Sequence, residues 1–128
     1  IQLTIVQTAE LDGVVVVTTP QEVALIDARK AIGLFERVET PILGVIENMS
    51  YFQCPSDGKI YHIFGEGGGE REAAKLGVPL LGKIPLDIAT RSGGDEGRPV
   101  ALEDPEKNPV SAAFRQVAEQ CARVVLDR

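Results

Sequence analysis

The spacing of hydrophobic positions along the chain changes between that of strands and that of helices. Residues 14–17 form an apolar run of β-branched side chains between Asp-Gly and Thr-Thr-Pro, which is typical of a strand covered on both faces. Apolar residues in 21–38 recur at helical spacing, and a second apolar run follows at 42–46. Strand, helix and strand joined by short connections predict a βαβ unit with parallel strands.

The rest of the chain alternates in the same way, without internal repeats or low-complexity tracts. Its predicted segments, in order, are a loop rich in Gly, Pro and Ser at 48–69, a helix at 70–76, a strand at 79–84, a turn of helix from 85–87, a polar connection at 92–108 and a helix at 109–126. Residues 1–10 also have the spacing of an amphipathic helix.

Alternating strands and helices predict an α/β fold with a doubly wound, mostly parallel sheet and flanking helices. About three strands are predicted in the chain, and a parallel sheet of that size leaves an edge with unpaired backbone groups. The chain also begins at Ile1, within a helical pattern. We therefore expect residues 1–128 to be a single partial domain, the C-terminal half of a larger sheet.

The composition limits the classes of partner. Hydrophobic residues make up 44% of the chain, which is enough for one globular core. A net charge of -6 opposes binding to nucleic acid, because phosphates attract clustered Lys and Arg. No apolar run approaches the roughly 20 residues that a membrane span requires. Two cysteines far apart in sequence predict a reducing, cytoplasmic setting and no disulfide framework.

Polar residues follow two of the predicted strands, where ligands bind in open α/β sheets. Asn48 can present one acceptor and two donors to the edge of a base, and residues 85–87 can press backbone against its face. Asn48, Pro85, Leu86 and Asp87 together therefore suggest an adenine pocket. Taken singly, Asn48 is better explained as the cap of a turn and Pro85 as the end of a strand, and only their joint placement favours the pocket.

A phosphate-binding loop needs glycines followed by Lys and Ser or Thr, and the chain contains no such motif. The glycine cluster at 65–70 lacks the lysine, and its two carboxylates would repel a phosphate. We expect this cluster to form the closely packed start of a helix.

The loop at 49–59 places Cys54 and two aromatic residues near the end of a strand, and loops of this content are often functional. A thiolate suits an iron–sulfur cluster or zinc, although one cysteine per chain cannot fill four ligand positions. The alternative is a partly buried Cys54 beside a β-turn at 55–58. Cys121 has the spacing of a core residue, and His62 has no partner at the spacing of a metal or catalytic site.

Motifs distributed nearly end to end make the chain similar to the Mrp/ApbC family of iron–sulfur cluster carrier ATPases, relatives of the MinD-like deviant P-loop ATPases. The matching segments are VVTTPQEVALIDARK at 16–30, GVIENMSYF at 44–52, IFGEGGG at 63–69, GKIPLD at 82–87 and SGGDEGRP at 92–99.

This resemblance implies a homodimeric ATPase that uses ATP with Mg²⁺, holds a [4Fe–4S] cluster between its subunits and delivers it to apo iron–sulfur proteins. The Walker A loop and the switch aspartate of the family would lie upstream of Ile1, so we expect no ATP hydrolysis by this chain alone. The resemblance places Asn48 and residues 85–87 near the adenine, and residues 21–27 near the dimer and switch surface.

Cluster-binding members carry a Cys-x-x-Cys pair, whereas this chain has Cys54 and then Asp57 at the second position. A carboxylate is a harder and weaker ligand for cluster iron than a thiolate. One hypothesis is a labile cluster held by Cys54 of each subunit and completed by outside thiols. The other is a nucleotide-switched scaffold of the MinD or partition type, which binds a protein partner and no metal.

Overall fold

The protein is built on a three-stranded parallel sheet. The computed structural model describes residue 4 and residues 10–126, so the helix predicted for residues 1–10 lies almost wholly outside the described residues. Strands β1 (Val14–Thr18), β2 (Ile42–Glu47) and β5 (Leu80–Lys83) pair in the order β1-β2-β5, and both pairs are parallel.

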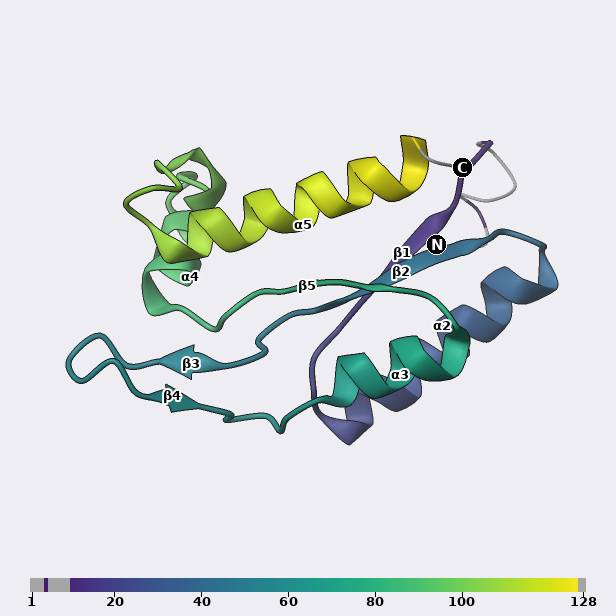
Figure 1. Ribbon diagram of the computed structural model, residues 1–128, viewed down its shortest axis with the longest axis horizontal. Helices are drawn as coiled ribbons and strands as arrows, with labels where there is room; N and C mark the ends of the chain where they lie inside the picture. Colours follow the sequence, from purple (N-terminus) through teal and green to yellow (C-terminus); the bar gives the residue numbers. More distant parts are fainter. Residues whose placement is uncertain (1–3, 5–9, 127–128) are drawn as a thin grey trace.

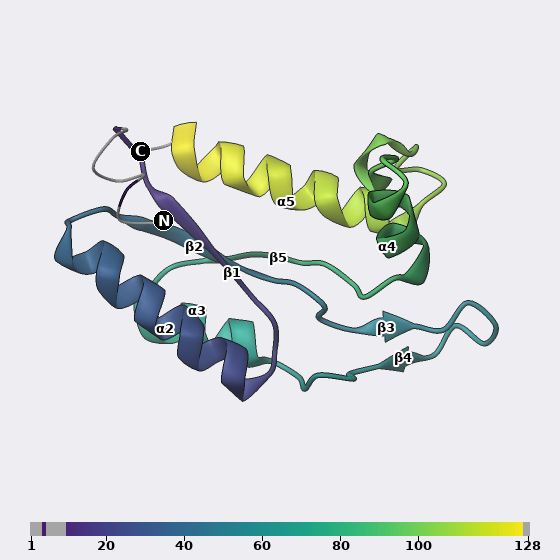
Figure 2. The same ribbon diagram turned by 180° about the vertical axis from the view of Figure 1, so that it is seen from behind.

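Helices cover both faces of this sheet. The helices α2 (Glu22–Arg37) and α3 (Gly68–Leu76) lie on one side, and α5 (Pro109–Leu126) lies on the other (Figures 1 and 2). This arrangement confirms the predicted α/β fold with flanking helices. Within the described residues, no helix is long and apolar enough to cross a membrane.

Two hydrophobic clusters hold the layers together. Ile46, Leu81, Ile84 and Val117 are packed together on the side of α5, and Val16, Ala28 and Ile32 are packed together on the side of α2. Leu25 is 2% exposed, and its burial contributes about 1.5–3 kcal/mol to stability. Since β2 lies between β1 and β5, it is the most deeply buried strand, and the residues that follow it are held by both neighbours.

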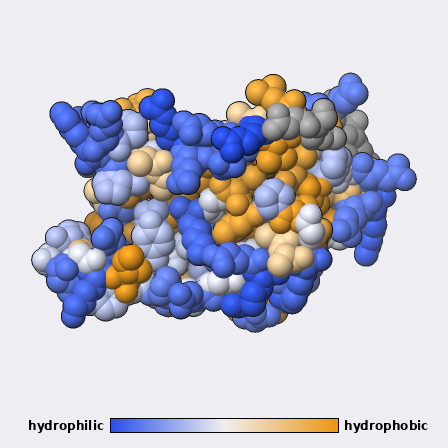
Figure 3. Space-filling view, viewed as in Figure 1, coloured by the Kyte–Doolittle hydropathy of each residue, from blue (hydrophilic) through white to orange (hydrophobic). Residues whose placement is uncertain are grey.

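Strand β1 departs from the expectation of a strand covered on both faces. It lies at one edge of the described sheet, and Val17 is 59% exposed. Hydrophobic side chains also gather over the middle of the sheet, with hydrophilic surface over much of the surrounding helices (Figure 3).

The segment predicted as a continuous loop at 48–69 contains a small hairpin, so that prediction was wrong in part. Strands β3 (Phe52–Gln53) and β4 (Ile60–Tyr61) pair in antiparallel fashion and extend beyond the sheet (Figure 1). Its tip is held by backbone hydrogen bonds from Cys54 N to Lys59 O (2.9 Å) and from Gly58 N to Cys54 O (2.8 Å). Gly58 adopts φ 72°, a conformation that favours glycine.

The polar connection predicted at 92–108 was also wrong in part. Helix α4 (Ile88–Asp95) occupies its beginning, and a 3-10 helix, η1 (Val100–Leu102), follows. The sequence predicted only a turn of helix from 85–87, because Gly93 and Gly94 have low helix propensity and the following residues are polar. Helix α3 likewise begins two residues before its predicted start, again at glycines.

Candidate functional site

The carboxyl ends of the three parallel strands meet at one place. Thr18 of β1 is level with Glu47 of β2, and Glu47 is level with Lys83 of β5. The backbone continues this pairing past the strands, with hydrogen bonds from Asn48 N to Thr18 O (2.7 Å) and from Ile84 N to Glu47 O (2.9 Å). The turn at Asn48 and the segment after Ile84 are therefore neighbours.

A cavity of about 270 Å³ lies between these segments. All four residues that the sequence assigned to an adenine pocket line it. They are Asn48, Pro85, Leu86 and Asp87. Arg91 and Phe114, which the sequence pattern did not single out, also line this cavity. An amide, an aromatic ring and a cation around one cavity can hold a planar base by hydrogen bonding and stacking. We call this cavity the base cavity.

Asp87, which lines the base cavity, also has a structural role at the start of α4. Its Oδ2 accepts hydrogen bonds from Thr90 N (2.9 Å) and Thr90 Oγ1 (2.6 Å), which makes it the N-cap of α4. The cap fixes the direction in which the chain leaves Pro85 and Leu86. Asp87 thus shapes the base cavity, and one of its carboxylate oxygens is already engaged.

Cys54 lies near the tip of the β3–β4 hairpin and is half-buried. Its Sγ is 3.1 Å from Ser56 Oγ. This hydrogen bond lowers the pKa of the Cys54 thiol, and backbone hydrogen bonds from Ser56 and Asp57 act in the same direction. A thiolate, the form that binds metals, is therefore more populated at neutral pH than for an ordinary cysteine.

Asp57 is engaged in the turn that follows Cys54. Its Oδ1 accepts a hydrogen bond of 2.9 Å from Lys59 N. His62 pairs with Glu66 at 3.5 Å on the surface. Among the described residues, no group of three His, Cys, Asp or Glu side chains could hold a metal ion within this chain.

A second cavity, of about 450 Å³, lies beneath the hairpin, and we call it the cysteine cavity. It is lined by Cys54 and Tyr51 and by Lys107 and Asn108, which directly precede α5. Residues 85–87 line both cavities. The sequence placed Cys54 and residues 85–87 in separate segments, and the structure brings both to the lining of the cysteine cavity. The Asn-Pro pair at 108–109 was a readable helix start, but it gave no sign of lying near Cys54.

An ion pair that the sequence pattern did not predict ties the helices of one face together. Arg29 Nε of α2 donates a hydrogen bond of 2.9 Å to Glu72 Oε1 of α3, and Arg29 Nη2 donates to the same oxygen. Glu72 is 5% exposed, and the hydrogen bond from Arg29 lowers the pKa of its carboxyl group. The same bond raises the pKa of Arg29.

A second ion pair joins α3 to the sheet. Lys83 at the end of β5 binds Glu70 of α3, which raises the pKa of Lys83 and lowers that of Glu70. Cys121, by contrast, is half-buried and packs against the hydrophobic cluster beneath α5, which agrees with its predicted place in the core.

The fold belongs to the P-loop NTPase class. The structure is similar to a nucleotide-binding protein from Archaeoglobus fulgidus in complex with ADP, with a TM-score of 0.65 and 40% identity over 75% of this chain and 40% of that chain. It is also similar to the cell division ATPase MinD of Pyrococcus furiosus, with a TM-score of 0.66 and 27% identity over 88% of this chain and 43% of that chain.

Within that class, the sequence profile of a ParA-type family described as "NUBPL iron-transfer P-loop NTPase" matches residues 1–122. The chain belongs to this family, which confirms the resemblance seen in its motifs.

Curated relatives agree with this membership. The iron-sulfur cluster carrier protein of Pyrococcus horikoshii is 49% identical over 92% of this chain and 39% of its own length. That of Aquifex aeolicus is 46% identical over 98% of this chain and 34% of its own length. The "iron-sulfur protein required for NADH dehydrogenase, mitochondrial" of Arabidopsis thaliana is 45% identical over 95% of this chain and 39% of its own length. This chain thus spans less than half the length of these relatives.

Proposed function

We propose that the protein containing this chain binds and hydrolyses ATP and carries an iron–sulfur cluster to apo iron–sulfur proteins in the cytoplasm. The observation that carries this proposal is that residues 85–87 line both the base cavity and the cavity that Cys54 lines. The names of relatives that are 43–49% identical support the same role. A segment shared by the nucleotide site and the cargo ligand allows the state of one to affect the other.

The described chain supplies the base end of the nucleotide site. In this proposal Asn48 reads the edge of the adenine, while the backbone of Pro85 and Leu86 packs against its face. Arg91 and Phe114 complete the walls. These 128 residues contain no phosphate-loop motif, so in this proposal the groups that hold the phosphates and Mg²⁺ would come from another part of the protein, and we expect no ATP hydrolysis by the 128-residue chain alone.

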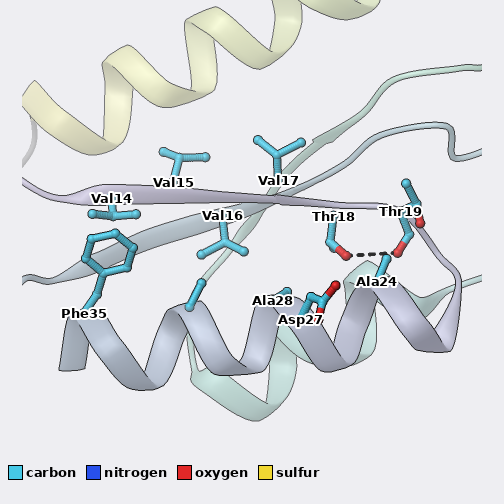
Figure 4. A pocket seen from close by; sticks show the side chains of 11 residues that line it. Val14, Val15, Val16, Val17, Thr18, Thr19, Ala24, Asp27, Ala28 and Phe35 are labelled. Carbon is cyan, nitrogen blue, oxygen red and sulfur yellow. Dashed lines mark hydrogen bonds between the residues drawn. The ribbon is translucent and has the colours of Figure 1, made fainter. Parts of the chain in front are cut away.

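The edge of β1 supports such a preceding part. A hollow of about 390 Å³ lies there, lined by residues 14–19 of the β1 segment and by side chains of α2 that include Ala28 and Phe35 (Figure 4). Val14 and Val16 point toward α2, whereas Val15 and Val17 point to the opposite face. Thr19 Oγ1 is buried without a hydrogen-bond partner. In the full protein, a further parallel strand would pair with β1 and cover these groups.

The cluster is the cargo of this proposed carrier, and Cys54 is its ligand from this chain. Two subunits of a homodimer would bring two Cys54 thiolates together, and a [4Fe–4S] cluster takes four. Since one oxygen of Asp57 is already bonded to Lys59 N, Asp57 is a poor substitute for the missing thiolate. Outside thiols would complete the set, which favours a labile and easily transferred cluster.

The exposed Val23 (74%) and Ile26 (43%) give α2 an apolar outer surface suited to the partner subunit.

Anaerobic reconstitution of the full-length protein tests this function. We expect iron and acid-labile sulfide to bind in equal amounts per dimer. Cys54→Ala should abolish this binding, because the variant removes the thiolate at the hairpin. Cys121→Ala is the matched control, since Cys121 packs against the core and should not affect the cluster. Wild-type protein that binds no more iron and sulfide than Cys54→Ala would refute the carrier role and favour the partner-binding scaffold.

A further inference from the structure

We propose that Glu47 is a positioning residue for the base cavity, because its buried carboxyl group fixes the turn that carries Asn48. We call this carboxyl group and its two hydrogen bonds the clasp. The inference rests on the proposed nucleotide-binding function. Glu47 is the last residue of β2 and directly precedes Asn48. It is 1% exposed, so its carboxyl group is isolated from water.

Both carboxyl oxygens of Glu47 are engaged by the protein. Oε2 accepts a hydrogen bond of 2.5 Å from Ser50 Oγ, and Oε1 accepts one of 2.9 Å from Gly69 N. Gly69 lies in the first turn of α3, where backbone N–H groups are unpaired and the helix dipole favours a negative group. A buried carboxyl group is costly without such partners, and here each oxygen has one.

The clasp fixes the conformation of the base turn. Ser50 is tied to Glu47 through its side chain and to Ile84 O through its backbone N–H (2.9 Å). Between these fixed points Met49 adopts φ 51°, a conformation that a residue with a side chain avoids unless its surroundings impose it. Asn48 is thereby held at the base cavity, although Glu47 itself is not among the residues that line it.

The same carboxyl group joins the two ends of segment 50–69, which carries Cys54. The chain leaves the sheet after Ser50 and returns at Gly69, and Glu47 binds both points. A Cβ added at Gly69 would lie 3.0 Å from Glu47 Cβ, a contact tighter than most real Cβ contacts, so Glu47 would have to shift by a few tenths of an ångström. A glycine therefore fits the close approach between the returning chain and Glu47 without any such shift.

Nucleotide selectivity in the full-length protein tests this role, because a change in general packing would leave it unaltered. Glu47→Leu fills the same space without hydrogen bonds, and we expect it to reduce the preference for ATP over GTP by at least about tenfold, since a misplaced Asn48 no longer reads adenine. Glu47→Gln should restore most of the preference. Its amide can accept from Gly69 N and donate to Ser50 Oγ.

The matched control is Glu72→Leu, which also removes a buried glutamate. Glu72 bonds to Arg29 and makes no hydrogen bond to the turn that carries Asn48. We expect this control variant to be less stable than wild type but to keep the same ratio of the dissociation constants for ATP and GTP. If Glu47→Leu does not fold, Ser50→Ala removes one of the two clasp bonds and should give a smaller loss of selectivity.

The outcomes separate this inference from the proposed function. A wild-type protein that binds neither nucleotide would overturn both. If wild type prefers ATP and a folded Glu47→Leu or Ser50→Ala variant keeps the same preference, only the role of Glu47 is overturned.

Discussion

The backbone N–H of Leu86 donates a hydrogen bond of 2.7 Å to the carbonyl oxygen of Tyr51. Leu86 also pairs with Phe52 in an isolated parallel bridge. Leu86 lines both cavities, and Tyr51 and Phe52 lead directly to Cys54. If a bound base displaced residues 85–87, this backbone pairing would carry the displacement to the cysteine hairpin.

ATP should accordingly change the reactivity of Cys54 in the full-length protein. We expect a several-fold change in the rate of its alkylation by iodoacetamide when ATP is added, because the nucleotide moves or stiffens the segment that supports the hairpin. Cys121, which lies in α5, serves as the internal control, and its rate should stay constant. Equal Cys54 rates with and without ATP would contradict the coupling. Mass spectrometry of the two cysteine peptides measures both rates.

The hydrogen bond from Ser56 should set the pH range in which Cys54 reacts. Because this bond lowers the pKa of the thiol, the thiolate persists to a lower pH than in an ordinary cysteine. Ser56→Ala should raise the midpoint of the alkylation rate against pH. Wild-type and variant profiles that coincide would show that Ser56 does not stabilise the thiolate.

Asp57→Cys should make the cluster site tighter. The substitution restores the Cys-x-x-Cys spacing and supplies a second thiolate per chain, a better ligand for iron than a carboxylate. We expect the reconstituted variant to lose iron to a chelator more slowly than wild type. Asp57→Ser is the control, because it also removes the carboxylate that binds Lys59 N but adds no thiol. A variant that loses iron as fast as this control would contradict the ligand position assigned here.

The ion pair between Arg29 and Glu72 should make stability depend on pH. Arg29 lowers the folded-state pKa of Glu72 below the usual 4.5, so the stabilisation is present above that value and is lost as pH falls through the folded pKa. Glu72→Gln should therefore reduce stability at neutral pH and flatten its loss in acid. Urea unfolding of both proteins at several pH values measures this. Parallel pH profiles would refute the assignment.

Much of the fold could be predicted because its elements bury regular faces. The apolar runs of β1 and β2 and the spacing in α2 and α5 predicted these elements to within about a residue. The β3–β4 hairpin was missed because backbone hydrogen bonds across a short turn hold it, and its side chains carry no alternating pattern.

The candidate site was predictable only where chain order implies proximity. Asn48 and residues 85–87 follow two parallel strands, and the ends of such strands meet at one edge. The contacts of Glu47 with Gly69 and of Arg29 with Glu72 join segments 22 and 43 residues apart, and no local pattern marks them. The position of Cys54 over residues 85–87 depends on the direction of the hairpin, which follows from tertiary contacts.

Cluster transfer tests the central claim most directly. The full-length protein, reconstituted and freed of loose iron and sulfide, should activate an apo-enzyme that requires a [4Fe–4S] cluster, and ATP should change the rate of activation. Cys54→Ala treated in the same way should give no activation, while Cys121→Ala should match wild type. Activation by wild type no faster than by the same quantity of free iron and sulfide would contradict the carrier function.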